Sequence, residues 1–91
     1  MEQNRRDVAN KQNFRVLLVW RDELEKATKQ AKCVCDDCLA SPIYGYYVAV
    51  LNRWMCEKCY KRWVEAAVRY PEDSWVEEKN YNFYKKLLGF E

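Results

Sequence analysis

The stretch CDDCLASPIYGYYVAVLNRWMCEKC, residues 35–59, begins and ends with a C-x2-C pair. Cys35 and Cys38 form the first pair, Cys56 and Cys59 the second, and seventeen residues separate the two. Each pair can bring two sulfur atoms to one tetrahedral Zn²⁺, so four thiolates would fill every coordination position. A catalytic zinc keeps one position open for water. The cysteines therefore predict one structural Zn²⁺ in a closed site.

The chain has 91 residues, a formal net charge of +2 and no histidine. A core of this size buries a modest amount of surface and gains from a metal staple. We expect one zinc-binding domain over residues 1–91. Within it we expect an N-terminal helix at 1–32, a zinc finger at 33–70 and a C-terminal helical extension at 71–91.

Nothing in the chain has the pattern of a membrane span or a signal peptide. Apolar runs such as residues 16–20 are far shorter than a membrane span, and the polar segment 1–11 lacks an apolar centre. Five cysteines, an odd number, suit reduced thiolates on a metal better than a disulfide framework. A cytoplasmic protein in a reducing compartment is therefore expected.

The N-terminal third contains apolar residues at alternating steps of three and four, which predicts an amphipathic helix over residues 12–31. These residues are Leu17, Trp20, Leu24, Ala27 and Ala31. An alternative divides the segment into a strand at 14–20 and a charged helix at 21–32, because β-branched and aromatic residues crowd its first part. The single helix is the preferred prediction.

Between the two cysteine pairs, residues 46–51 are apolar, β-branched and aromatic, as in a strand. A turn at Asn52 and Arg53 would lead back through Trp54 into Cys56, which makes a short hairpin. After Cys56, apolar residues at 60, 63, 64, 67 and 68 fall on one helical face that ends before Pro71. The fold class is therefore a small α+β fold.

The C-terminal segment begins with the spacing of a capping box, from Ser74 to Glu77. Asn80 and Asn82 then interrupt the helical pattern, so one kinked helix or two short helices are expected. Gly89 is placed to cap the C-terminal end.

The order of knuckle, hairpin and helix resembles the treble-clef zinc fingers, and the cysteine spacing is similar to that of GATA-type DNA-binding fingers. Members of that family have Leu-Trp-Arg after the first knuckle. This chain has SPIYG at residues 41–45, so the base-reading residues do not carry over. The finger of Arf GTPase-activating proteins is similar in layout, with a proline placed like Pro42. Its catalytic arginine follows a histidine, which this chain lacks, so no such activity is implied.

The chain also resembles the TraR/DksA-type regulators of RNA polymerase, which join an N-terminal helix to a four-cysteine finger of the same spacing. Their acidic D-x-x-D-x-A stretch corresponds to residues 4–9 here and matches only at Asp7 and Ala9. The resemblance is one of architecture.

The preferred functional prediction is a non-catalytic, zinc-stabilised module that binds a protein partner as an adaptor, regulator or inhibitor. Its small size would suit a protein encoded by a phage or mobile element. Tyrosine and tryptophan often anchor interfaces because they are large and rigid with a polar tip. The candidate partner-binding residues are Trp75, Tyr81, Phe83, Tyr84 and Phe90.

The alternative function is nucleic-acid binding or regulation of transcription through RNA polymerase. Basic side chains would neutralise phosphates while tyrosines stack on bases. The candidates are Arg5, Arg6, Lys11, Arg15, Arg53, Lys61 and Arg62. Acidic residues are interspersed among them, so a solvated charged face is the simpler interpretation.

Enzymatic activity and a small-molecule substrate are not expected. The chain has no Gly-rich phosphate loop, no histidine, and no paired carboxylates outside turns and capping positions. Cys33 could replace Cys35 in the metal site, act as a reactive thiol beside Lys32, or remain free. The free thiol is the preferred interpretation.

Overall fold

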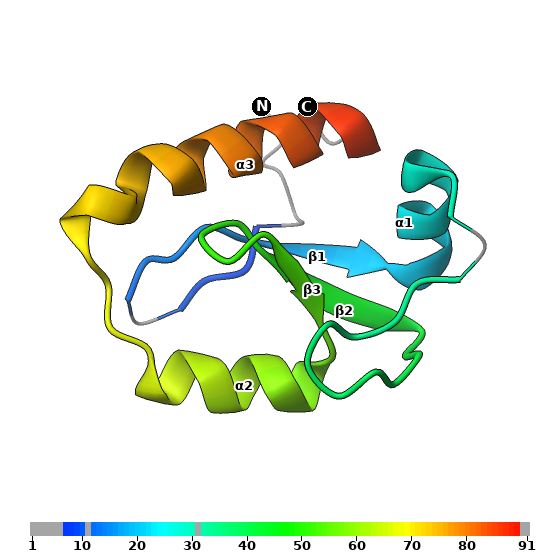
Figure 1. The fold of residues 1–91 in the computed structure, drawn as a ribbon, viewed down its shortest axis with the longest axis horizontal. Helices are drawn as coiled ribbons and strands as arrows, with labels where there is room; N and C mark the ends of the chain where they lie inside the picture. The colour runs from blue at the N-terminus through cyan, green and yellow to red at the C-terminus, as the bar shows by residue number, and fades with distance from the viewer. Residues whose placement is uncertain (1–6, 11, 31, 90–91) are drawn as a thin grey trace.

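The computed structural model describes residues 7–10, 12–30 and 32–89. Its elements are β1 (Val16–Trp20), α1 (Arg21–Thr28), β2 (Tyr44–Val48), β3 (Arg53–Met55), α2 (Glu57–Ala66), the 3-10 turn η1 (Pro71–Asp73) and α3 (Ser74–Leu88). The strands form one antiparallel sheet in the order β1-β2-β3. Helices α1 and α3 lie on one side of this sheet and α2 on the other (Figure 1). No described helix is long and apolar enough to cross a membrane.

The prediction of one helix over residues 12–31 is wrong, and the alternative of a strand followed by a helix is correct. Strand β1 pairs with β2 along its whole length, and α1 begins at the next residue. Val16 packs on the α2 side of the sheet, whereas Leu17 and Val19 pack on the side of α1 and α3. The strand is apolar on both faces because helices cover both faces.

Two hydrophobic cores therefore share the sheet. The core on the α1 and α3 side includes Leu17, Val19, Leu24, Cys33, Tyr47, Ala49, Trp54 and Tyr81. The core on the α2 side includes Phe14, Val16, Cys35, Val48, Met55, Cys59 and Tyr60. Two of the candidate metal ligands, Cys35 and Cys59, thus belong to the core on the α2 side of the sheet.

The predicted hairpin and the helix after Cys56 are both present. Strand β2 begins two residues earlier than expected, and the turn into β3 includes Asn52 in a left-handed conformation. The Trp54 indole N–H donates to the Val19 carbonyl, 3.2 Å away, which links β3 to β1 across β2. Helix α2 ends at Ala66, before Pro71.

Helix α3 is a single helix of fifteen residues, so the expected interruption at Asn80 and Asn82 is wrong. Asn80 donates from its side chain to the Ala49 carbonyl at 2.9 Å and so attaches the helix to the sheet. Gly89 adopts φ +74° as the predicted cap. The capping box is wrong, because Ser74 is already helical and the Glu77 side chain is buried.

Gly45 provides a test of the packing between β2 and β3. A Cβ atom at this position would lie 2.7 Å from the Met55 carbonyl oxygen and 2.7 Å from the Trp54 ring. We expect Gly45→Ala to lower the free energy of unfolding by about 3 kcal/mol, the upper end for overpacking, because a strand backbone cannot easily move away. Thermal melting with excess zinc measures the loss.

Gly89→Ala is the matched control, because its Cβ would meet no atom within 4 Å and only its left-handed φ is strained. That strain costs about 1 kcal/mol. A Gly45→Ala variant no less stable than Gly89→Ala would contradict the close contact.

Candidate metal centre

The four predicted ligands lie together. The Sγ atoms of Cys35, Cys38, Cys56 and Cys59 are all within 4.8 Å of one another, and those of Cys38 and Cys56 are 3.7 Å apart. Zinc–sulfur bonds of 2.3 Å in a tetrahedron place the sulfurs about 3.8 Å apart. The cluster is therefore positioned to bind a metal ion and is consistent with a zinc-finger-like site.

The first pair lies on a tight turn ahead of β2, at residues 35–40, which we call the knuckle. The Cys35 N–H donates to the Ala40 carbonyl at 2.7 Å, and the Leu39 N–H donates back to the Cys35 carbonyl at 2.9 Å. Within the turn, the N–H groups of Asp37 and Cys38 point at the Cys35 sulfur, at 3.4 and 3.5 Å. Leu39 closes the turn with φ +67°, a left-handed conformation. The turn thus surrounds one sulfur with N–H donors.

Asp36 joins this turn to β3. Its N–H donates to the Trp54 carbonyl at 2.9 Å, and its carboxylate accepts the Trp54 N–H at 3.1 Å. These two bonds occupy the outer edge of β3 and bring the first cysteine pair next to Cys56. Sequence reasoning missed this role, because no residue pattern indicates that a carboxylate in the knuckle pairs with a strand.

The second pair spans the start of α2. Cys56 is the N-cap residue, and its carbonyl accepts the Tyr60 N–H at 2.9 Å. Cys59 follows in the first turn and is buried. Thiolates here lie at the positive end of the helix dipole, where negative charge is stabilised.

The surroundings of Cys35 favour its thiolate form. Burial opposes its ionisation, but hydrogen bonds from the backbone N–H groups of Cys38, Cys56 and Asp37 outweigh burial and lower the pKa of Cys35 to about 7. At Cys59, burial comes first and the neighbouring thiols add to it, so its pKa is raised. A bound Zn²⁺ would favour the thiolate form of all four cysteines and would offset half of their negative charge.

A polar chain flanks the second pair. Tyr44 donates from its hydroxyl to Glu57 at 2.8 Å, and Lys61 pairs with the same carboxylate at 2.9 Å. The hydrogen bonds from Lys61 and then Tyr44 lower the pKa of Glu57. These contacts tie the start of α2 to the start of β2, beside the cysteine cluster.

Cys33 lies outside the metal cluster. Its side chain belongs to the core on the α1 and α3 side, whereas Cys35 belongs to the core on the other side. Its N–H donates to the Glu25 carboxylate at 3.0 Å, and its thiol contacts the Gln30 side chain at 3.6 Å. Burial raises the pKa of the Cys33 thiol. It is a free, buried thiol and not a substitute for Cys35.

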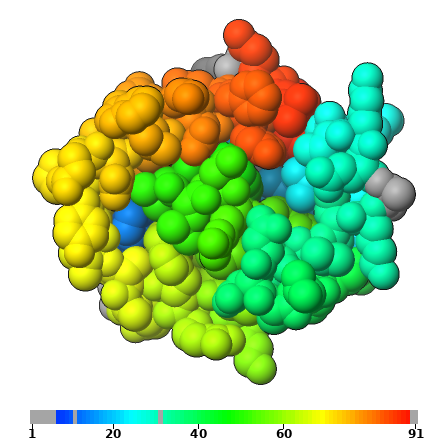
Figure 2. Space-filling view, in the orientation of Figure 1, coloured from blue at the N-terminus to red at the C-terminus, as the bar shows by residue number. Residues whose placement is uncertain are grey.

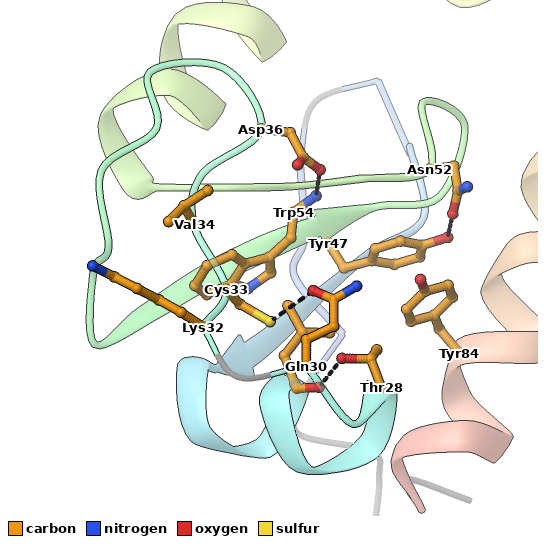
Figure 3. A pocket seen from close by; sticks show the side chains of 11 residues that line it. Thr28, Gln30, Lys32, Cys33, Val34, Asp36, Tyr47, Asn52, Trp54 and Tyr84 are labelled. Atoms are coloured by element: carbon orange, nitrogen blue, oxygen red, sulfur yellow. Dashed lines mark hydrogen bonds between the residues drawn. The ribbon is translucent and has the colours of Figure 1, made fainter.

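Cys33 also lines a cavity of about 190 Å³ between α1, the knuckle and α3 (Figure 3). Tyr47 and Tyr84 lie on one side of it with their rings stacked, their centroids 4.0 Å apart. The Tyr47 hydroxyl donates to Asn52 at 2.7 Å. The stacked rings hold α3 on the sheet, and the Tyr47 hydroxyl is fixed by the β2–β3 turn.

The structure divides the predicted partner-binding residues. Trp75 and Phe83 on α3 are 65% and 60% exposed. Tyr81 is buried and donates to Asp7 at 2.6 Å, and Tyr84 is half-buried against Tyr47. Phe90 lies outside the described residues. Of the four candidates that the structure describes, only Trp75 and Phe83 are therefore available to a partner.

The predicted nucleic-acid residues are also divided. Arg5, Arg6 and Lys11 lie outside the described residues. Arg15 lies over the Tyr81 ring, 4.8 Å from its centroid, next to α3. The others are Arg53, Lys61 and Arg62, which are exposed on β3 and α2. Because α2 and α3 lie on opposite sides of the sheet, Arg15 and the α2 residues do not form one basic surface (Figure 1).

Apolar residues also line a hollow elsewhere on the surface. The N-terminal segment shows at the bottom of a hollow between the β2–β3 turn and the linker that precedes α3 (Figure 2). This hollow has a volume of about 230 Å³ and an apolar lining that includes Phe14, Val50, Trp63 and Tyr70. Trp20 and Ile43 are exposed at the far end of the sheet.

Comparison with known proteins adds no relative: no family model, no curated protein and no solved structure matches this chain. The residues and their geometry therefore carry the functional argument.

Proposed function

We propose that this chain is a zinc-stabilised, non-catalytic binding module of the treble-clef type. The observation that carries the proposal is the closed set of four sulfurs, all within 4.8 Å of one another. Four cysteine ligands fill a tetrahedral Zn²⁺ site and leave no position for a reacting water. The ion would supply folding energy, and the chain would supply the binding surface.

The proposed partner is a protein. Support comes from Trp75 and Phe83, large aromatic side chains that remain exposed on a helix, and from the exposed Ile43 and Trp20. Aromatic residues of this kind form the centres of protein interfaces. The candidate basic residues that the structure describes support a nucleic-acid partner less well, because they lie on both sides of the sheet and Lys61 is paired with Glu57.

Affinity capture with the zinc-loaded protein, from the cells that express it, tests the proposed partner class. We expect a protein to be retained after nuclease treatment and at both 0.1 M and 0.5 M salt. Phosphate contacts weaken steeply with salt, so a nucleic-acid ligand would be lost at the higher concentration. Capture that disappears with nuclease would contradict a protein partner. Zinc analysis of the same sample should give one ion per chain.

A further inference from the structure

Helix α3 carries a row of exposed apolar and basic side chains on the side opposite its packed face. Trp75, Lys79, Phe83 and Leu87 follow one another at steps of four, and we call them the α3 stripe. Trp75 is 65% exposed, Phe83 60% and Leu87 38%. The Lys79 ammonium lies 5.8 Å from the centroid of the Trp75 ring. Residues at steps of four form a ridge that can pack against another helix.

A second row, Glu78, Asn82 and Lys86, runs beside the α3 stripe and is also exposed. It carries a negative charge at one end and a positive charge at the other. Neither Glu78 nor Lys86 has an oppositely charged residue three or four positions away. Neither forms an ion pair with any residue that the structure describes. The row therefore presents two opposite charges that have no charged partner among residues 7–10, 12–30 and 32–89.

We infer that a second copy of this chain binds the α3 stripe, with the two α3 helices antiparallel about a two-fold axis near Asn82. An antiparallel two-fold places equivalent rows against each other in reverse order. Glu78 of each copy then faces Lys86 of the other, and Asn82 faces its own equivalent. The pairing rests on the protein-binding role proposed above and names the partner at this surface.

The α3 stripe has nearly the same symmetry, with its centre one residue from Asn82. Trp75 and Leu87 are equidistant from residue 81, and so are Lys79 and Phe83. In the antiparallel pair, each Trp75 therefore packs on the other copy's Leu87. Each Lys79 ammonium reaches the other copy's Phe83 ring, a cation–π contact. The stripe spans about 18 Å at a rise of 1.5 Å per residue.

The charges favour a second copy over a uniformly charged partner. Glu72, Asp73 and Glu78 lie toward the N-terminal end of α3, whereas Lys85 and Lys86 lie toward its C-terminal end. An anionic membrane or a nucleic acid would attract the lysines of α3 but would be repelled by Glu72, Asp73 and Glu78. A reversed copy of the same helix matches both ends. One pair of helices buries less than the roughly 1,200 Å² of a standard interface, so the dimer is expected to be weak.

Sedimentation velocity of the zinc-loaded protein from 5 to 500 µM tests this pairing. We expect a concentration-dependent monomer–dimer equilibrium. The double variant Trp75→Ala/Phe83→Ala should remain monomeric at every concentration. Val68→Ala is the matched control, because Val68 is exposed and apolar but lies outside the stripe, and it should leave the equilibrium unchanged. Zinc content and circular dichroism check that each variant is folded.

Charge exchange tests the two-fold directly. Glu78→Lys alone and Lys86→Glu alone each turn two attractive pairs into two repulsive ones, so each should weaken the dimer about tenfold. The double variant Glu78→Lys/Lys86→Glu should restore dimerisation, because each pair is attractive again in reverse. The inference would be overturned if the wild type were monomeric at all concentrations. It would also be overturned if the charge variants dimerised as strongly as the wild type.

Binding to other surfaces gives distinguishable outcomes. If the wild-type chain stays monomeric but binds phosphatidylglycerol vesicles or a single-stranded oligonucleotide, and Trp75→Ala/Phe83→Ala removes that binding, the stripe serves another partner and the inference is wrong. A monomeric chain that still captures a nuclease-resistant protein partner leaves the proposed function standing. The two proposals therefore fail separately.

Discussion

Cys59→Ser should lose both its zinc and its cooperative thermal unfolding. Cys59 is buried in the first turn of α2 and belongs to the core on the α2 side. Zinc binding in small fingers contributes about 10 to 16 kcal/mol, more than the few kcal/mol expected from a core of this size. A serine hydroxyl is a poor zinc ligand and cannot replace the thiolate. Melting followed by circular dichroism, together with metal analysis, measures both losses.

Cys33→Ala is the matched control, since Cys33 is also a buried cysteine but lies outside the cluster. It should retain one zinc per chain and lose about 1 kcal/mol, as expected for a small cavity. Chelation of the wild-type protein should reproduce the Cys59→Ser result, and added zinc should reverse it. A Cys59→Ser protein that melts cooperatively near the wild-type temperature would show that the metal is not required for the fold.

The cysteine cluster and helix α2 could be predicted from the sequence because their signals are local. The spacing of the four cysteines already restricts which sulfurs can meet. The apolar face of α2 and the break before Pro71 are also visible in a short window. The position of Asp36 against Trp54 could not be predicted, because that contact depends on how the knuckle folds back onto β3.

Strand β1 illustrates what a periodic pattern cannot decide. Val16 and Leu17 point into different cores, so the strand lacks the alternation of a half-buried strand. An apolar run buried on both faces cannot be told from a buried helix by periodicity alone. The β-branched residues at 16 and 19 were the better signal here. Only the pairing with β2 decides between the two.

On helix α3, the sequence pattern alone also does not decide which residues are exposed. Tyr81, Phe83 and Tyr84 are close in sequence, yet they differ in exposure because a helix turns them to different sides. Tyr81 and Tyr84 face the sheet, and Phe83 faces outward. Which side faces the sheet depends on contacts that are distant in sequence, such as the bond from Asn80 to Ala49.

Glu77→Ala should destabilise the fold more than any other substitution of an acidic residue on α3. The Glu77 carboxylate is 2% exposed. It accepts the Arg15 N–H at 2.7 Å and pairs with Arg69 at 2.8 and 3.0 Å. Its loss would leave the Arg15 amide without an acceptor and Arg69 without its counter-charge. We expect a loss of about 3 kcal/mol, the lower end for a buried pair, because Arg69 is partly exposed and can be rehydrated.

Glu77→Gln separates the two contributions of this carboxylate. The glutamine amide keeps an oxygen acceptor for the Arg15 N–H but removes the charge that faces Arg69. The melting temperature of the Glu77→Gln variant should therefore lie between those of wild type and Glu77→Ala. Glu72→Ala, an exposed acidic residue nearby, is the control and should change stability by no more than about 0.5 kcal/mol. If Glu77→Ala were as mild as Glu72→Ala, the contacts of the Glu77 carboxylate would contribute little to stability. A large loss would instead establish that this carboxylate joins α3, the linker before it and the segment leading into β1.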